Sequence, residues 1–292
     1  GLLAVCAQLE ALHDLLAASG DVAYAEKIER ITENALAGML RPEGVCAGQA
    51  VNRLGNDETC AVREATRKET SALLRAMHAV RRSVWMVKGE AELAMLLPYE
   101  SCCLARMDGT PVRISSVATG LHTLTLTVET KQPVEFTLYL HAPGYAESAT
   151  VAINGGKPVN VACGKANAIK RMFQTGDTLT FTLQCVPFVE TGYRGSASVY
   201  YGSLLMALPL PEAGAAWQYA LQEDTPFSVG WEVGRPRVTV DACLAPDWAL
   251  RNGAMTAPPQ GLPMGEAYEL TLLPYADTLG RVAGFPQAVT RA

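Results

Sequence analysis

The spacing of apolar residues changes once along this chain, from a helical period to the period of β-strands. Over the first 84 residues, apolar positions recur every three or four residues, as on one face of a helix. Helices are predicted over residues 1–19, 22–40 and 63–83, with Gly20 ending the first. Their inward faces are predicted to consist of Cys6, Leu9, Leu12 and Leu16 in the first helix, Ile28, Ile31, Ala35 and Met39 in the second, and Leu73, Leu74, Met77 and Val80 in the third.

After residue 84, apolar and polar residues alternate instead, which is typical of strands with one buried face. In the segment 123–128, two leucines and a valine alternate with threonines. The segments 134–140 and 178–185 follow the same rule, and Asn154-Gly155 supplies turn chemistry between such runs. Many short strands with one polar face indicate an antiparallel β-sandwich.

These patterns predict an α+β protein of several domains. Residues 1–84 are expected to form a helical segment, residues 85–210 an antiparallel β-sandwich, and residues 211–292 a small C-terminal β domain. A stretch rich in Pro and Ala, "LPLPEAGAAW", indicates the linker between the last two. A chain of 292 residues is long enough to bury such cores.

Composition and charge narrow the class of protein. The net charge of -5 offers no basic field for nucleic acid. No uninterrupted apolar run reaches the length of about 20 residues that spans a membrane. Eight cysteines in 292 residues are too few for a disulfide-stapled scaffold, and several occupy apolar positions. We therefore expect a cytoplasmic protein that binds neither nucleic acid nor membranes.

Two short stretches contain residue types that could bind zinc. "NDETC" holds Glu58 and Cys60 two positions apart, and "ESCC" holds Cys102 and Cys103 side by side. One carboxylate and three thiolates would satisfy a tetrahedral zinc site. However, adjacent residues of a strand point to opposite faces, so Cys102 and Cys103 could share a metal only with local distortion. A relocated metal site, with Cys46 as a substitute ligand, stays open beside the interpretation as ordinary strand thiols.

Several segments, taken in order, give the chain a family resemblance. The first is "LLAASGDVAYAEKIERITENALAGM", with a Gly-Asp followed by Tyr-Ala-Glu, Glu-Arg and Asn-Ala-Leu. Then come "SVWM" with "AELAMLLPYE", "DGTPVRI", "FTLYLHAPGYA", "ATVAINGGKPV", "MFQTGDTLTFTL", "VYYGSLLMALPL" and "YELTLLPYADTLGRVAGFP". This order resembles the C-terminal half of the glycoside hydrolase family that contains the bacterial β-L-arabinofuranosidases.

The resemblance implies a fold and a chemistry. Residues 1–84 would be the remnant of an (α/α)6 barrel, followed by sandwich domains. Family enzymes cleave a terminal arabinofuranose with retention, using a zinc-bound cysteine as nucleophile and a glutamate as acid/base. Their Glu-x-Cys pair would fall here at Gly1-Leu2-Leu3, and their Cys-Cys pair at Lys68-Glu69 or Thr59-Cys60. Because none of these supplies the ligands, we expect no catalytic, cofactor-binding or metal-binding residues, although zinc is the family's metal.

Three functions stay open on the sequence alone. The chain could be an arabinofuranosidase-like relative without an intact catalytic centre. It could be the C-terminal portion of an active enzyme, completed by another segment or by a partner chain. It could also be a non-catalytic module that binds glycan or acts as a scaffold. Carbohydrate, and an oligomer that covers an incomplete barrel, are the expected partners.

Two expectations about single residues accompany these readings. Glycan binding predicts exposed aromatic residues, for which Tyr139, Tyr145, Tyr200 and Tyr201 are the candidates, although strand aromatics more often pack. His141 is predicted to be a solvated residue at an outward strand position.

Overall fold

The structure is a computed structural model that describes residues 1–47, 61–192, 195–210, 218–248, 250–251, 254–255, 258–278 and 281–289. The chain divides into two compact units. The sandwich unit comprises residues 6–29 and 72–186, and the C-terminal unit comprises residues 1–5, 30–71 and 187–292.

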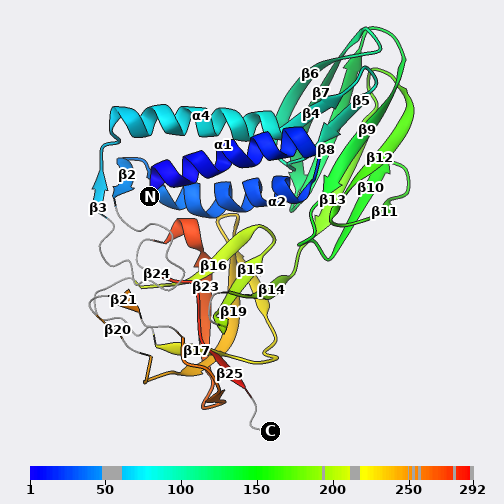
Figure 1. Cartoon of the computed structure of the whole chain (residues 1–292). Coiled ribbons are helices and arrows are strands. Elements are labelled where there is room, and N and C mark those ends of the chain that lie inside the picture. The colour runs from blue at the N-terminus through cyan, green and yellow to red at the C-terminus, as the bar shows by residue number, and fades with distance from the viewer. Residues whose placement is uncertain are drawn as a thin grey trace. The chain divides into compact units, whose positions relative to one another are not determined.

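Helices α1 (Leu2–Ser19), α2 (Ala23–Arg30) and α4 (Arg67–Val84) contribute most of their length to the sandwich unit. Figure 1 shows α1 and α4 side by side, and a hydrogen bond of 2.9 Å joins His13 Nδ1 to Ser83 Oγ. The predicted inward face of α1 is confirmed, because all four of its apolar residues are buried. Among the described helices, α1 alone is long and apolar enough to cross a membrane, but a buried face is equally typical of a core helix.

The predicted inward face of α4 is wrong in two positions. Leu74 is 67% exposed and Met77 is 46% exposed. The buried face is formed instead by small residues, namely Ala72, Ala76 and Ala79, together with Val80, Ser83 and Val84. Small side chains let a neighbouring helix approach closely, and this shifts the buried stripe away from the larger residues.

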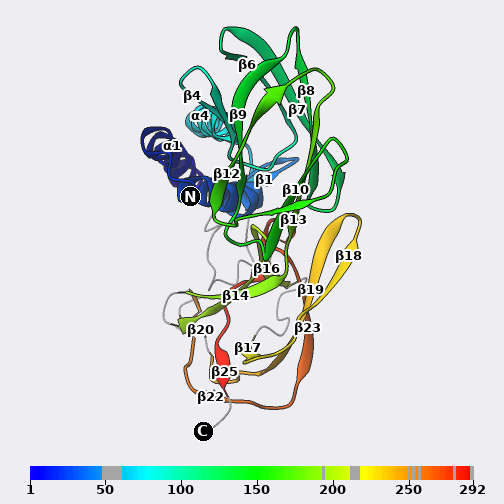
Figure 2. The same ribbon diagram turned by 90° about the vertical axis from the view of Figure 1, so that its right-hand side faces the viewer.

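Two sheets form the sandwich (Figure 2). The six-stranded sheet has the order β11-β10-β13-β8-β7-β6, and the four-stranded sheet has the order β12-β9-β5-β4. Neighbouring strands are antiparallel except for β5 and β9. The strands are β4 (Trp85–Lys88), β5 (Glu92–Met95), β6 (Ser101–Met107), β7 (Thr110–Gly120), β8 (Thr123–Thr130), β9 (Val134–Ala142), β10 (Ser148–Ile153), β11 (Val159–Val161), β12 (Lys165–Phe173) and β13 (Thr178–Gln184).

The core of the sandwich is built from the alternating apolar positions that the sequence predicts. Leu126 and Val128 of β8 meet Phe136 and Leu138 of β9 in one cluster of buried side chains. Phe136 also stacks on Phe173, with ring centroids 4.3 Å apart. Each strand therefore presents its polar residues away from the opposite sheet.

The C-terminal unit contains the rest of the second predicted helix and a large sheet. The helical part is the π-helix Ile31–Leu36 followed by α3 (Ala37–Met39). Strands β1 (Leu40–Arg41), β2 (Gly44–Ala47) and β3 (Ala61–Arg63) form a small sheet. The remaining elements are β14 (Pro187–Thr191), β15 (Ala197–Tyr201), β16 (Leu204–Pro209), β17 (Tyr219–Gln222), β18 (Ser228–Glu232), β19 (Arg235–Leu244), β20 (Leu250–Arg251), β21 (Ala254–Met255), β22 (Leu262–Pro263), β23 (Tyr268–Pro274), the 3-10 helix Tyr275–Asp277, β24 (Arg281–Val282) and β25 (Gln287–Val289).

The fold is a mixed α+β fold rich in strands, as predicted. The division into 1–84, 85–210 and 211–292 is not confirmed, since strands β14 to β16 pair in one sheet with β23 and β19 from the last part of the chain. Most of the proposed linker lies outside the described residues. That residues 1–84 are the remnant of a barrel stays a prediction.

Candidate functional site

The adjacent cysteines Cys102 and Cys103 lie on β6 and face opposite sides of its sheet. Cys102 is exposed, and Arg113 Nε donates a hydrogen bond of 3.2 Å to its sulfur. Cys103 is half-buried against the sandwich core, where burial raises the pKa of its thiol to about 11. The two side chains point apart, so they do not share one metal ion.

The other residues of the possible zinc site do not complete it. Glu58, Cys60 and the side chain of Cys46 lie outside the part of the chain that the structure describes. Within the part of the chain that the structure describes, no group of three His, Cys, Asp or Glu side chains could hold a metal ion. Lys68 is exposed, and Glu69 is bound by Arg63 through hydrogen bonds of 2.8 and 2.9 Å. The described residues therefore do not fit the zinc centre of the family.

His141 corrects the expectation of a solvated side chain. It is 2% exposed, and its Nδ1–H donates to the carbonyl oxygen of Leu96 at 2.8 Å. Its Nε2 lies 3.4 Å from Glu26 Oε1 on α2. The strand pattern placed His141 outward from the sandwich core, but α2 covers that position within the same unit.

A second polar contact links α2 to the sandwich beside His141. Tyr145 Oη donates a hydrogen bond of 2.7 Å to Glu29 Oε1, and Glu29 is buried. Burial raises the pKa of Tyr145 well above its usual value of 10, and the Glu29 carboxylate raises it further. The phenol therefore stays protonated and acts as a donor to a buried carboxylate.

The four tyrosines suggested as a glycan platform do not gather on one exposed surface. Tyr200 and Tyr201 are buried, and Tyr145 is engaged with Glu29. Tyr139 is half-buried and donates a hydrogen bond of 3.1 Å to Glu92 Oε1. The packing role that strand aromatics commonly have is the one observed here.

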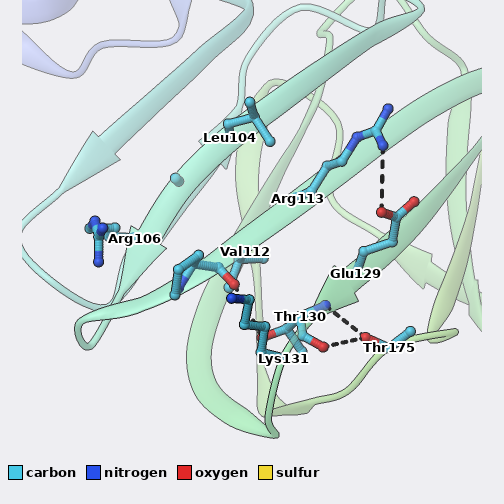
Figure 3. A pocket seen from close by; sticks show the side chains of 10 residues that line it. Leu104, Arg106, Val112, Arg113, Glu129, Thr130, Lys131 and Thr175 are labelled. Atoms are coloured by element: carbon cyan, nitrogen blue, oxygen red, sulfur yellow. Dashed lines mark hydrogen bonds and ion pairs between the residues drawn. The ribbon is translucent and has the colours of Figure 1, made fainter.

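A groove of about 740 Å³ lies on the outer face of the six-stranded sheet (Figure 3). Arg113 on β7 and Glu129 on β8 face each other across it, with 3.5 Å between Arg113 Nη1 and Glu129 Oε2. Arg106 and Lys131 also line it, which gives three cations against one carboxylate in a chain of net charge -5. Its lining is completed by Leu104, Ala105, Pro111, Val112, Thr130 and Thr175.

The groove has a fixed lower edge and an apolar side. Thr130 N donates a hydrogen bond of 2.7 Å to Thr175 Oγ1, which joins the end of β8 to the turn before β13. Leu104, on the apolar side, is 79% exposed. A concave surface with an apolar wall and a few charged groups is a usual form of ligand-binding site. We take this groove as the candidate site.

Sequence reasoning missed the groove because its residues come from separate strands. Arg113 and Glu129 are direct cross-strand partners, but that register is not visible in either segment alone. The alternation of β7 and β8 does indicate that both side chains point away from the core. Two histidines were missed in the same way, since His13 and His78 line one groove between α1 and α4.

Comparisons with known proteins relate part of this chain to a glycoside hydrolase family. The family model described as "Beta-L-arabinofuranosidase, GH127 middle domain" matches residues 112–185. The resemblance to the bacterial β-L-arabinofuranosidases is thereby confirmed: this chain is arabinofuranosidase-like. No curated protein sequence matches the chain.

Solved structures extend the similarity to nearly the whole chain. A GH127 β-L-arabinofuranosidase from Geobacillus stearothermophilus has a TM-score of 0.69 at 18% identity, covering 96% of this chain and 48% of its own. A second structure, of a glycoside hydrolase, has a TM-score of 0.69 at 14% identity, covering 94% of this chain and 50% of its own. A GH127 β-arabinofuranosidase has a TM-score of 0.70 at 14% identity, covering 99% of this chain and 50% of its own. The chain thus spans about half the length of these structures.

Proposed function

We propose that this chain is an arabinofuranosidase-like protein that has no zinc–thiolate catalytic centre of its own. The observation that carries the proposal is the geometry of Cys102 and Cys103, which face opposite sides of β6. Cys103 is half-buried against the sandwich core, whereas the Cys102 sulfur is exposed and accepts a hydrogen bond from Arg113 Nε. Glu69, at one of the places where the family has its cysteine pair, is held by Arg63 instead.

The test combines metal content with hydrolysis. Protein purified without a chelator or a metal-binding tag is analysed for zinc, and an aryl β-L-arabinofuranoside is offered as substrate. A complete GH127 arabinofuranosidase serves as the positive control for both measurements. We expect zinc far below one ion per chain and no hydrolysis. One zinc per chain that is lost in Cys60→Ser but kept in Cys6→Ser, together with hydrolysis, would overturn the proposal.

A second candidate function is that of one portion of an active hydrolase, completed by another segment or a partner chain. Two observations favour it: the chain spans about half of the similar structures, and α4 exposes Leu74 and Met77. Large apolar side chains exposed together are typical of surfaces that another element covers. Size-exclusion chromatography with light scattering separates the two candidates. A stable monomer favours the first, and a protein that is soluble only with a partner favours the second.

A further inference from the structure

Threonines form rows of hydroxyl groups on the outer face of the six-stranded sheet. Three Thr–Thr cross-strand pairs join β8 to β13, namely Thr127–Thr178, Thr125–Thr180 and Thr123–Thr182. The rows continue onto β10 and β7, where Thr150 pairs with Thr182 and Ser115 with Thr127. We call this surface the threonine face, and it consists of Ser115, Thr123, Thr125, Thr127, Thr150, Thr178, Thr180 and Thr182.

The threonine face and the groove are parts of one surface. The pair Ser115–Thr127 follows the pair Arg113–Glu129 by two residues on each strand. Residues two apart on a strand point to the same side, so the hydroxyl rows begin where the charged groove ends. All eight side chains of the threonine face are half-buried, as in a flat array in which each shields its neighbours.

We propose that the groove and the threonine face together bind an extended anionic glycan, of the kind built from uronic acid residues. The choice of a carbohydrate rests on the arabinofuranosidase-like relationship. The choice of an anionic one rests on the charges of the groove.

The hydroxyl rows provide a ladder of polar contacts with a regular spacing. Neighbouring strands lie about 4.8 Å apart, so a glycan that runs across them meets one hydroxyl group per strand. A hydroxyl group can both donate and accept hydrogen bonds, as sugar hydroxyls do, so Thr123 Oγ1, which donates to Thr182 Oγ1, and Thr125 Oγ1, which is paired with Thr119 Oγ1, each keep further capacity for a ligand. The threonine methyl groups would contact the sugar ring. Because β-branched side chains have few rotamers, little conformational entropy is lost when the ligand binds.

The groove supplies cations that are available to a carboxylate. Arg113 is already partly neutralised by Glu129 at 3.5 Å. Arg106 donates to the carbonyl oxygen of Gly109, and neither Arg106 nor Lys131 forms an ion pair with a described residue. A guanidinium matches the planar carboxylate of a uronate, and a nearby ammonium adds a second positive charge.

Neither the charged groove nor the threonine face alone indicates this ligand. Threonine is common on strands because its branched side chain suits the pleated surface. The described outward positions of this face include no aromatic side chain, so stacking on a neutral sugar ring is not the mode of recognition here. Charge and hydroxyl rows on one continuous surface point to a glycan that carries both carboxylates and hydroxyls.

The experiment measures binding of a short oligogalacturonate by isothermal titration calorimetry at low salt. A neutral arabino-oligosaccharide and a random single-stranded DNA are titrated in parallel. The double variant Arg106→Ser/Lys131→Ser removes the two cations, and Thr125→Val/Thr180→Val removes two hydroxyls while keeping the side-chain shape. The control Lys157→Ser/Lys165→Ser removes the same charge from exposed positions outside this face. Thermal unfolding confirms that each variant is folded.

We expect the oligogalacturonate to bind, with affinity about tenfold weaker in each variant of the groove and of the threonine face, and nearly unchanged in the control. No binding would overturn the proposal. Equal weakening by the lysine control, or equal binding of the DNA, would reveal only a general attraction of polyanions and would also overturn it. Tighter binding of the neutral oligosaccharide would overturn the anionic ligand class. Zinc content and hydrolysis are measured separately, so failure of the proposed function is distinguishable from failure here.

Discussion

The side-chain amide of Asn34 takes the place of a neighbouring strand beside Leu205. Its Oδ1 accepts a hydrogen bond of 2.7 Å from Leu205 N, and its Nδ2 donates one of 2.8 Å to the carbonyl oxygen of Ser203. Nδ2 also donates to the carbonyl oxygen of Arg30, the last residue of α2, one turn earlier in the chain. Asn34 lies in the π-helix, a rare form of helix that often occurs at functional sites. The amide therefore ties this helix to the β15–β16 hairpin.

Replacing Asn34 by Leu should lower the free energy of unfolding by about 2 kcal/mol or more. Leucine has a similar shape but leaves the Leu205 N–H and the Ser203 carbonyl without this partner, and each buried unpaired group costs about 1–3 kcal/mol. Urea unfolding monitored by circular dichroism measures the change. Asn160→Leu, at an exposed position on β11, is the control and should change stability by less than about 0.5 kcal/mol. Equal effects would show that the amide bridge contributes nothing.

Removing the Tyr145 hydroxyl should also destabilise the protein. Tyr145→Phe deprives the buried Glu29 carboxylate of a donor at 2.7 Å, and hydrogen bonds to charged groups contribute about 1.5–3 kcal/mol. Because burial raises the Tyr145 pKa well above 10, the loss should be the same at pH 6 and pH 9. Tyr268→Phe removes an exposed phenol that lies 3.4 Å from Glu266 and serves as the matched control. A loss no larger than that of the control would contradict the buried contact.

The start of α4 should become less stable in acid because Glu69 is protonated there. Thr66 and Glu69 form a capping box, in which Glu69 N donates to Thr66 Oγ1 and Thr66 N donates to Glu69 Oε2. The hydrogen bond from Arg63, followed by those from Thr66, lowers the pKa of Glu69 from 4.5 to about 2. The Glu69 carboxyl group therefore stays ionised to a lower pH in the folded state than in the unfolded chain. The stabilisation is fully present above pH 4.5 and is lost as the pH falls toward 2.

Glu69→Gln tests this sign. The variant should melt at a lower temperature than the parent at pH 7, and the difference should shrink as the pH falls from 4.5 to 3. Glu147→Gln, at an exposed position with no resolved role in a cap, should show no such pH dependence. A difference that grows in acid would reverse the sign and reject the assignment.

The sandwich could be predicted because the burial of each strand residue follows from its near neighbours in the sequence. Burial of Leu126 or Phe136 follows from alternation within one strand, and the end of α1 follows from Gly20, whose φ of 69° suits a left-handed cap. The start of α4 at Arg67 rather than 63 follows from the capping box, which the sequence Thr-Arg-Lys-Glu does contain. These features depend on neighbours a few residues away.

The candidate site could not be predicted because it depends on contacts between residues that are far apart in the sequence. His141 is buried by Glu26 on a helix that is distant in sequence, and its strand pattern carries no trace of that helix. The groove requires the register that sets Arg113 opposite Glu129. Leu74 was expected on the inward face of α4 because it is large and apolar. A neighbouring helix packs against the alanines instead, so the buried face of α4 lies elsewhere.

The two adjacent cysteines should differ sharply in reactivity, which also tests whether they act as a pair. At pH 8 a thiol with a pKa of about 11 is roughly one part in a thousand thiolate, so Cys103 should react slowly with a maleimide. Cys102 is exposed beside Arg113 and should be labelled in the native state. Peptide mapping by mass spectrometry assigns the label, with Cys102→Ser and Cys103→Ser confirming each site and urea-unfolded protein showing that both can react. Equal protection of both cysteines that is lifted by a chelator would mean that they hold a metal together, against the geometry of β6.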